Sequence, residues 1–288
     1  MHPMSFEGTR SRIWRASVSV SAWVLITGVM LSACGDLGSS PAAGTFAPRT
    51  PGVLTVVTST LPSPGFWEGT AHHPTGGLEY ELARDLADRF GLKSVRIEIE
   101  HFHRIVAGRL GGADLALDLI TPTSQREQSL DFSTPYLDAA PTVLVRSGQP
   151  VPDLETAQSL RWGAIRGTTF VGMIDSMIAP DQSLQLFENS PAMLAALKAN
   201  KIDAVLFDLP LAVVTAGRSG GRLKTAAQLP DAESIAAALP KGSSNAQAVD
   251  SAIRAFTSDG TLDHLLHVWV GSAATNGASS IPLLHTTR

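Results

Sequence analysis

Short apolar runs alternate with segments of helical spacing along most of the chain. Val53 to Thr58 is a β-branched, apolar run and predicts a buried strand. Glu79 to Phe90 has Leu82 and Leu86 at helical spacing, with acidic residues in its first turn and Gly91 just beyond its end. A strand, a helix and a further strand in this order indicate the start of a parallel sheet.

The first series of elements continues to about residue 130. The pattern predicts strands at 95–99 and 114–120 and a short helix around 105–110. A further helix is expected to open near Ser124, because Ser124 and Glu127 have the Ser-x-x-Glu spacing of a capping box.

A second series of strands and helices follows it. Strands are expected at 161–165, near 184–187 and at 202–207, with one helix after the Gly167-Thr168-Thr169 turn. Another helix is expected to run to about Ala199, capped by Ser190 and with Pro191 at its first position. Two such series in tandem predict two α/β lobes.

The N-terminal segment has the layout of a secretory leader. Basic residues extend to Arg15, an apolar run covers 16–30, and Leu31-Ser32-Ala33-Cys34 resembles the lipobox of bacterial lipoproteins. The resemblance implies a signal peptide at 1–33 and a Cys34 that is acylated, with palmitate or a similar chain, and anchors the protein to the cell membrane. Residues 34–50, rich in Gly, Ser, Pro and Ala, are expected to form a flexible linker. An ordinary cleaved signal with an unrelated cysteine is the alternative.

Composition narrows the classes of function. The chain has 288 residues, 44% of them hydrophobic, which is enough for one large or two modest domains. Its formal net charge of −4 becomes more negative once the leader's arginines are removed, so nucleic acid is not expected as a partner. Cys34 is the single cysteine, so no intramolecular disulfide is possible.

Arg126 and Asp208 are the main candidates for chemistry. Arg126 follows the turn after an apolar strand, where open sheets bind ligands, and a guanidinium can hold a carboxylate by two hydrogen bonds. Asp208 ends a strand of the second series, where its carboxylate could pair with an ammonium group. The alternatives are a solvated surface arginine and an internal salt bridge or helix cap.

Three motifs carry a resemblance to a known family. Asp114 to Leu117, Thr121 to Arg126 and Asp131 to Tyr136 together resemble the signature of the family 3 extracellular solute-binding proteins, the amino-acid receptors of bacterial ABC importers. The similarity covers roughly residues 51–273. It implies a two-lobed periplasmic-binding-protein-like α/β fold of type II, each lobe a mainly parallel sheet flanked by helices, the lobes joined by two hinge strands near 136–140 and 230–234.

The resemblance also implies roles for individual residues. In that family, the residues matching Arg126 and Thr121, with main-chain amides near Thr169, bind the ligand carboxylate, and the residue matching Asp208 binds the ammonium. Leu119 stands where the family usually has glycine, and Ser59 stands where many relatives have aspartate. We therefore include both as expected ligand-binding residues.

Asp118 is an acidic residue in an otherwise apolar strand. Two interpretations stay open: a buried pair with a hinge or helix group, or selection of a cationic ligand side chain. The eight histidines show no cluster with the spacing of a metal site, and no cofactor motif is present, so neither metal nor cofactor is expected.

Lobe 1 is expected at 51–136 plus 235–273, lobe 2 at 141–229, and a C-terminal tail at 274–288. The predicted function is an extracytoplasmic, lipid-anchored, monomeric substrate-binding protein without enzymatic activity, which binds a polar amino acid by hinge closure and works with an ABC permease and its ATPase. One alternative is a cyclohexadienyl-dehydratase-like enzyme on the same scaffold, with Asp118 as acid or base. Another is a ligand sensor for a signalling protein.

Overall fold

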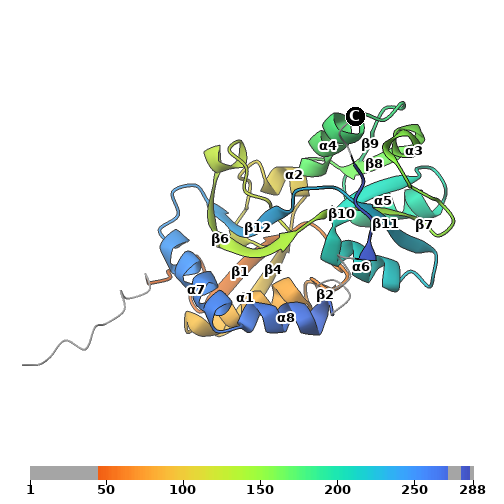
Figure 1. The fold of residues 1–288 in the computed structure, drawn as a ribbon. Coiled ribbons are helices and arrows are strands. Elements are labelled where there is room, and N and C mark those ends of the chain that lie inside the picture. The colour runs from red at the N-terminus through yellow and green to blue at the C-terminus, as the bar shows by residue number, and fades with distance from the viewer. Residues whose placement is uncertain (1–44, 272–279, 286–288) are drawn as a thin grey trace, which may run out of the picture. The chain divides into compact units, whose positions relative to one another are not determined.

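Two five-stranded sheets form the framework of the computed structural model, which describes residues 45–271 and 280–285 (Figure 1). The first sheet has the order β4 (Ser94–Ile99), β1 (Val53–Thr58), β5 (Leu115–Ala116), β12 (Glu233–Pro240) and β6 (Leu130–Ala139). The second has the order β11 (Leu223–Gln228), β7 (Pro141–Arg146), β10 (Ala204–Asp208), β8 (Trp162–Ile165) and β9 (Gln185–Phe187). A small pair, β2 (Glu68–Gly69) and β3 (Pro74–Gly76), completes the described strands.

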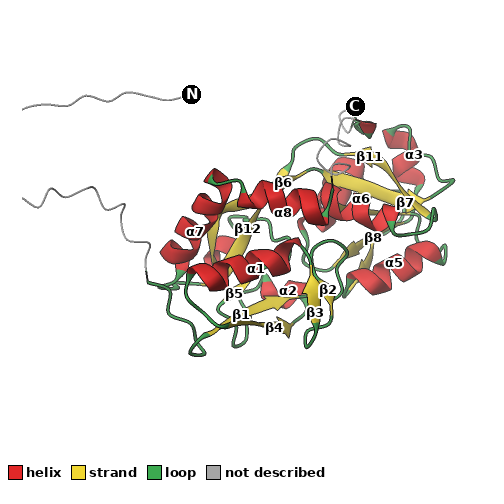
Figure 2. Ribbon diagram, turned by 90° about the horizontal axis from the view of Figure 1, so that it is seen from below, coloured by secondary structure: helices red, strands yellow, loops and turns green. Residues whose placement is uncertain are grey.

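Helices cover both faces of the first sheet. On one side lie α1 (Leu78–Arg89), α7 (Ala246–Ser258) and α8 (Thr261–Trp269), and on the other lies the short α2 (Phe102–Ile105) (Figures 1 and 2). Because side chains alternate along a strand, Val56 packs with α1 in one buried cluster while Val57 packs with Phe102 in another. The first lobe therefore buries its central strand on both sides.

The second lobe is covered in the same way by five helical segments. These are α3 (Leu154–Ser159), α4 (Thr169–Met173), the π-helical turn η2 (Ile174–Ile178), α5 (Ser190–Lys198) and α6 (Leu209–Gly217). Phe170 and Ile174 pack against Trp162 of β8 in a buried cluster, and Leu284 from the C-terminal segment joins it. This segment also runs beside β11, where the Leu284 amide donates to the carbonyl of Gln228 at 2.7 Å.

Both sheets are mixed, so the expectation of mainly parallel sheets is wrong. In the first sheet β1 is parallel to β4 and β5, but β12 is antiparallel to β5 and β6. In the second sheet β10 and β9 are parallel to β8, but β7 is antiparallel to β10 and β11. The antiparallel pairs arise because β6, β7, β11 and β12 belong to the two passages of the chain between the lobes, which run in opposite directions.

These two passages are short and lie together. The chain leaves β6 after Ala139 and enters β7 at Pro141, and it returns from β11 to β12 through residues 229–232. Glu233 pairs with Ala139, and the Leu229 amide donates to the carbonyl of Pro141 at 2.8 Å. Two crossing segments joined in this way are a suitable place for a hinge.

The expected helix from Ser124 is also wrong. The chain forms only the 3-10 turn η1 (Arg126–Gln128), and the Arg126 amide donates to Oγ1 of Thr123 at 3.2 Å, not to Ser124. Strand β6 begins two residues later at Leu130, so there is no room for a longer helix. Similarly, the cap of α5 is Asn189, whose Oδ1 accepts from the Ala192 amide at 2.9 Å, in place of Ser190.

Two further elements are shorter or earlier than expected. The strand expected at 114–120 is reduced to β5, because Leu119 has a φ of 49° and turns the chain out of the sheet. The helix expected around 105–110 is α2, which begins at Phe102 and ends at Ile105.

Candidate ligand-binding site

A cleft with both polar and apolar walls lies where the two lobes face each other. Six residues that the sequence singled out line it together: Ser59, Leu119, Thr121, Arg126, Thr169 and Asp208. The space open to the centre of a water molecule is about 60 Å³, enough for several waters and thus for the polar end of a small ligand. The structure therefore brings all six candidates to one place.

Strand ends supply most of the cleft. Ser59 follows β1, Leu119 lies three residues after β5, and Asp208 is the last residue of β10. Thr169 begins α4, after the turn that ends β8. Because the carboxyl ends of parallel strands meet at one edge of a sheet, residues far apart in sequence converge at this cleft.

Arg126 is a buried cation without a carboxylate partner. Its side chain is 7% exposed, and its Nη1 and Nη2 donate to the main-chain carbonyls of Thr121 at 2.6 Å and of Gly167 at 2.9 Å. Among the described residues no ion pair includes Arg126. Burial lowers the pKa of Arg126 to about 10, so the guanidinium stays charged at neutral pH. An unpaired buried cation favours an anion bound in the cleft.

Asp208 is the matching buried carboxyl group from the second lobe. It is 5% exposed and stands at the N-terminus of α6, but its side chain caps no amide of that helix. In the part of the chain that the structure describes, it also forms no ion pair. Burial, and then the nearby charge of Glu233, raise the pKa of Asp208 to about 8. A cationic group beside it would restore the ionised form.

Glu233 is a neighbour of the anion-binding groups that sequence reasoning missed. Its Oε2 accepts a hydrogen bond from Oγ1 of Thr169 at 2.8 Å, and it belongs to β12, at one of the lobe crossings. Burial raises the pKa of Glu233, whereas Thr169 and Arg126 lower it. No motif pointed to it, because its position depends on the return of the chain from the second lobe.

Asp118 lines the cleft on the side of the first lobe. Its Oδ1 accepts from Oγ1 of Thr58 at 2.9 Å, and its Oδ2 accepts from the Ser59 amide at 3.0 Å. Burial, with the nearby charge of Glu79, raises the pKa of Asp118 to about 7. The expected alternative of a buried salt bridge is not present, since no ion pair within residues 45–271 and 280–285 includes Asp118.

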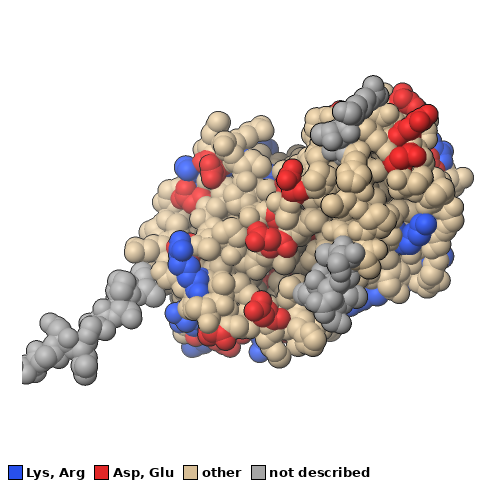
Figure 3. Space-filling view, in the orientation of Figure 1, with Lys and Arg blue, Asp and Glu red and all other residues tan. Residues whose placement is uncertain are grey.

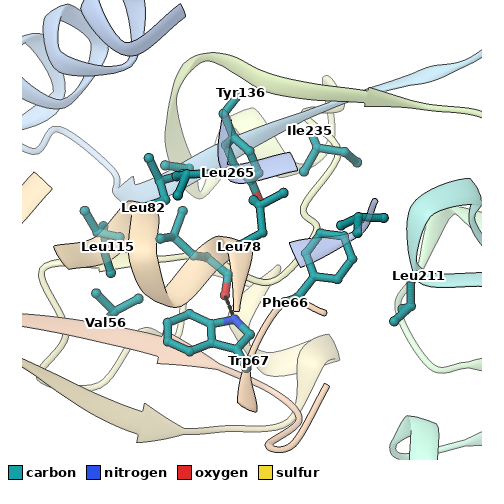
Figure 4. Close-up of a cluster of buried hydrophobic side chains, with 14 of the residues drawn as sticks. Val56, Phe66, Trp67, Leu78, Leu82, Leu115, Tyr136, Leu211, Ile235 and Leu265 are labelled. Atoms are coloured by element: carbon teal, nitrogen blue, oxygen red, sulfur yellow. Dashed lines mark hydrogen bonds between the residues drawn. The ribbon is translucent and has the colours of Figure 1, made fainter. Parts of the chain in front are cut away.

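A buried carboxylate supports the loop that carries Asp118 and Leu119. Glu79 of α1 accepts from Nε1 of Trp67 at 2.7 Å, from the Leu119 amide at 2.8 Å and from the hydroxyl of Tyr136 at 2.5 Å. Trp67 and Tyr136 lie in the apolar core of the first lobe (Figure 4). The network fixes Leu119 in its left-handed conformation, which explains why a glycine would suit this position.

Aromatic rings also line the cleft. Phe102 lies 5.4 Å from the guanidinium carbon of Arg126, a cation–π distance, and Phe170 lines the cleft from α4. Phe66 and Trp67, in the loop after β1, do not reach the cleft and are fully buried in the core. They face inward because the loop after β1 folds back on α1, where the Leu78 and Glu79 amides donate to carbonyls of Gly65 and Phe66.

Three further features of the described residues concern metal, membrane and surface charge. No group of three or more His, Cys, Asp or Glu side chains among them could hold a metal ion. The described helices include none long and apolar enough to cross a membrane. On the face shown in Figure 3, Lys and Arg are interspersed with Asp and Glu, unlike the continuous basic surface that phosphate backbones require. Cys34 and the leader lie outside the described residues.

Two mixed α/β lobes, two crossing segments and a cleft with buried charges of both signs define a two-lobed binding protein. Residues 55–272 match the family model of the bacterial extracellular solute-binding proteins, family 3. The chain belongs to this family, as its motifs indicated.

Curated relatives and solved structures agree with this assignment. The L-cystine-binding protein of Escherichia coli is 25% identical over 69% of this chain and 76% of its own, and the glutamine-binding protein of a Bacillus subtilis ABC transporter is 27% identical over 67% and 72%. A substrate-binding protein of Streptococcus pneumoniae bound to L-arginine has a TM-score of 0.67 at 28% identity, over 78% of this chain and 94% of its own. The L-cysteine receptor of Neisseria gonorrhoeae has a TM-score of 0.70 at 25% identity, over 80% and 94%. The predicted type II two-lobed fold is confirmed.

One further group of relatives is longer than this chain. The membrane-bound lytic murein transglycosylase F of a Pseudomonas fluorescens strain is 26% identical over 86% of this chain, but the match covers only 52% of that protein. The similarity is therefore confined to a part of these enzymes.

Proposed function

We propose that this protein is the extracytoplasmic substrate-binding component of an ABC importer and that it binds one amino acid between its lobes. The observation that carries the proposal is the pair of buried, unpaired and opposite charges, Arg126 and Asp208, in one cleft. An α-amino acid carries a carboxylate and an ammonium group on the same carbon, and therefore matches this pair. The cystine- and glutamine-binding relatives, and the arginine-bound structure, support an amino acid as the ligand.

The ligand carboxylate docks on Arg126 and Thr121 from lobe 1 and on the amides at the start of α4, near Thr169, from lobe 2. Thr169 stands in the first turn of α4, where main-chain amides have no partner within the helix. Asp208 receives the ammonium group.

Hinge closure completes this site. We place lobe 1 at 51–136 plus 235–273, lobe 2 at 141–229, and the hinge strands at 136–140 and 230–234. A ligand that contacts both lobes stabilises the closed state, whereas the empty protein lacks these contacts. A permease can therefore distinguish the ligand-bound protein from the empty one.

The N-terminal segment has a role of its own in this function. Residues 1–33 act as a signal peptide, Cys34 carries the lipid that holds the protein to the cell membrane, and 34–50 is a spacer. The protein acts as a monomer with a permease and its ATPase as partners.

An enzyme on the same scaffold is the second candidate. The pKa of Asp118, raised by burial to about 7, is the observation that favours it, since a general acid or base works best near the ambient pH. Such an enzyme, similar to a cyclohexadienyl dehydratase, would eliminate water from a prephenate-like acid. Product formation from such an acid by the purified protein, lost in Asp118→Asn, is the result that would favour it.

Thermal unfolding of the purified full-length protein tests the binding proposal. The twenty amino acids and a set of carboxylic acids are screened against the parent, Arg126→Ala and the control Arg254→Ala, whose guanidinium pairs with Asp250 on the surface. A ligand at a hundred times its Kd stabilises by about 2.7 kcal/mol, a rise of roughly 5 to 10 °C in the midpoint. We expect one or a few amino acids to raise the midpoint of the parent and of Arg254→Ala only. No response to any amino acid, or an equal response in Arg126→Ala, would overturn the proposal.

A further inference from the structure

The charges in the cleft do not balance for a neutral amino acid. Arg126 is the one cation among the lining residues, whereas Asp118 and Asp208 are both carboxylates. The α-carboxylate and α-ammonium of a ligand match Arg126 and Asp208. Among the described residues Asp118 is then left beside the bound molecule without a positively charged partner, which a buried carboxylate tolerates poorly.

Asp118 is held in a fixed orientation and can still accept a hydrogen bond from a ligand. Thr58 and the Ser59 amide each donate one hydrogen bond to it, one to each oxygen, and the Ser59 hydroxyl is a further donor at the same carboxylate. An ionised carboxylate accepts about four hydrogen bonds, so roughly one acceptor position is left for a ligand. Thr58 is the last residue of strand β1 and Ser59 follows it directly, so the carboxylate is oriented before any ligand arrives.

Thr60 provides a second, independent observation at the same place. It follows Ser59, is buried, and lines the cleft, but its Oγ1 has no hydrogen-bond partner. Buried hydroxyl groups are normally satisfied, so an unsatisfied one facing a cleft points to a polar group of a ligand. Ser63 lines the cleft in the same loop and adds a further acceptor.

We propose that the ligand is an amino acid with a cationic side chain, a guanidinium or an ammonium group, which binds to Asp118 and Thr60. The inference rests on the proposed function and names its substrate class. A cationic group carries several N–H donors and no acceptor, which matches a carboxylate beside hydroxyl oxygens. With its own α-carboxylate and α-ammonium, such a ligand also balances the charges of the three lining residues Arg126, Asp118 and Asp208.

Other side chains fit this end of the cleft less well. An acidic side chain would place a second negative charge against Asp118, and an apolar one would leave the carboxylate and the Thr60 hydroxyl unsatisfied. A neutral amide can donate hydrogen bonds but cannot compensate the charge. Specificity for a cationic side chain therefore has two sources. One is the ion pair with Asp118, and the other is the unfavourable binding of acidic, apolar and amide side chains.

Calorimetric titration with L-arginine and L-citrulline tests the inference, because the two differ in charge but hardly in shape. L-Lysine and L-glutamine form a second pair. We expect the parent to bind the cation at least about tenfold more tightly than the neutral partner of one pair or both. Asp118→Asn is expected to remove or reverse this preference, and Thr60→Val to weaken binding of the cation. Asp175→Asn changes an exposed carboxylate and serves as the matched control.

The outcomes separate this inference from the proposed function. If citrulline and glutamine bind the parent as tightly as arginine and lysine, the cationic class is wrong while the amino-acid receptor stands. An unchanged preference in Asp118→Asn likewise contradicts the inference. If none of the four amino acids binds the parent, the inference is wrong. The thermal-unfolding screen of all twenty amino acids then tests the proposed function separately. Retained binding of the neutral ligand by Asp118→Asn shows that this variant is folded.

Discussion

Arg126 donates a hydrogen bond across the cleft to the main-chain carbonyl of Gly167, at 2.9 Å, so the expected carboxylate anchor of one lobe also touches the other lobe. Gly167 has a φ of 88°, and a Cβ atom there would lie 2.8 Å from the Cα of His103 in the first lobe. Close approach of the two main chains therefore requires the absence of a side chain at this position.

Gly167→Ala is expected to hold the lobes apart. No ligand-binding side chain is removed, but the closed state loses stability, and we expect ligand affinity to fall at least about tenfold. Calorimetric titration measures it, with Gly172→Ala as control, since a Cβ at Gly172 meets nothing within 4 Å. Parent-like affinity in Gly167→Ala would show that the closed arrangement does not depend on this contact.

Asp208→Asn separates recognition of the ammonium group from recognition of the carboxylate. Loss of a partner from a buried, hydrogen-bonded charge pair costs about 2 to 5 kcal/mol, so amino-acid binding should weaken at least about thirtyfold. The deaminated acid with the same side chain has no ammonium group, and its weak binding should be unchanged or improved. Equal losses for both ligands would mean that Asp208 acts on the structure of the cleft instead.

Binding should strengthen as the pH rises from 6 to 8.5. Burial raises the pKa of Asp118 to about 7 and of Asp208 to about 8, and both must lose a proton to hold a cation. The nearby charges act in both directions on Asp208, since Glu233 and Glu79 raise its pKa and Arg126 lowers it. We expect at least about tenfold tighter binding at pH 8.5 and release of roughly one proton at pH 7, measured by titration in buffers of different ionisation enthalpy.

The empty protein should show the opposite pH trend. Both carboxyl groups have a folded pKa above the unfolded value of about 4, so their contribution to stability is present below that pH and is lost as the pH rises to 8. Chemical denaturation of the ligand-free protein is therefore expected to give a lower free energy of unfolding at pH 8.5 than at pH 5.5. Asp208→Asn should flatten this dependence, and an unchanged slope in that variant would contradict the assignment.

Glu79→Gln is expected to damage both stability and binding. An amide can accept at its oxygen, but its NH₂ group would face either Trp67 at one position or both Leu119 and Tyr136 at the other. Leaving a buried donor unsatisfied costs about 1 to 3 kcal/mol, a fall of several degrees in the thermal midpoint. Glu81→Gln on the same helix breaks only a surface pair with Arg84 and should shift the midpoint little. A midpoint for Glu79→Gln equal to that of Glu81→Gln would show that the network is not stabilising.

Periodicity located most of the fold, because local sequence decides where apolar residues can form strands and helices. The strand at Val53–Thr58 is found as predicted, and α1 differs from its prediction by one residue at each end. The failures lie where tertiary contacts decide. At Ser124 the early start of β6 prevents the expected helix, and the crossing segments bring antiparallel strands into sheets expected to be mainly parallel.

The candidate site was predicted in part. Arg126, Asp208 and the four other residues were found through motifs at strand ends and a family resemblance, and the structure places them around one cleft. Glu233 and Thr60 were missed, because one reaches the cleft only through a return crossing and the other is notable only for its unsatisfied hydroxyl. Such features depend on three-dimensional packing, which a single sequence does not encode locally.

The central claim is that Arg126 and Asp208 hold the two ends of an amino acid, and calorimetric titration of the full-length protein with a matched set of ligands tests it most directly. The set consists of an amino acid that raises the thermal midpoint, its decarboxylated amine and its deaminated acid. We predict that each analogue binds at least about a hundredfold more weakly than the amino acid, because each leaves one buried charge unpaired. If either analogue binds as tightly as the amino acid, the corresponding residue does not recognise the ligand and the account is wrong.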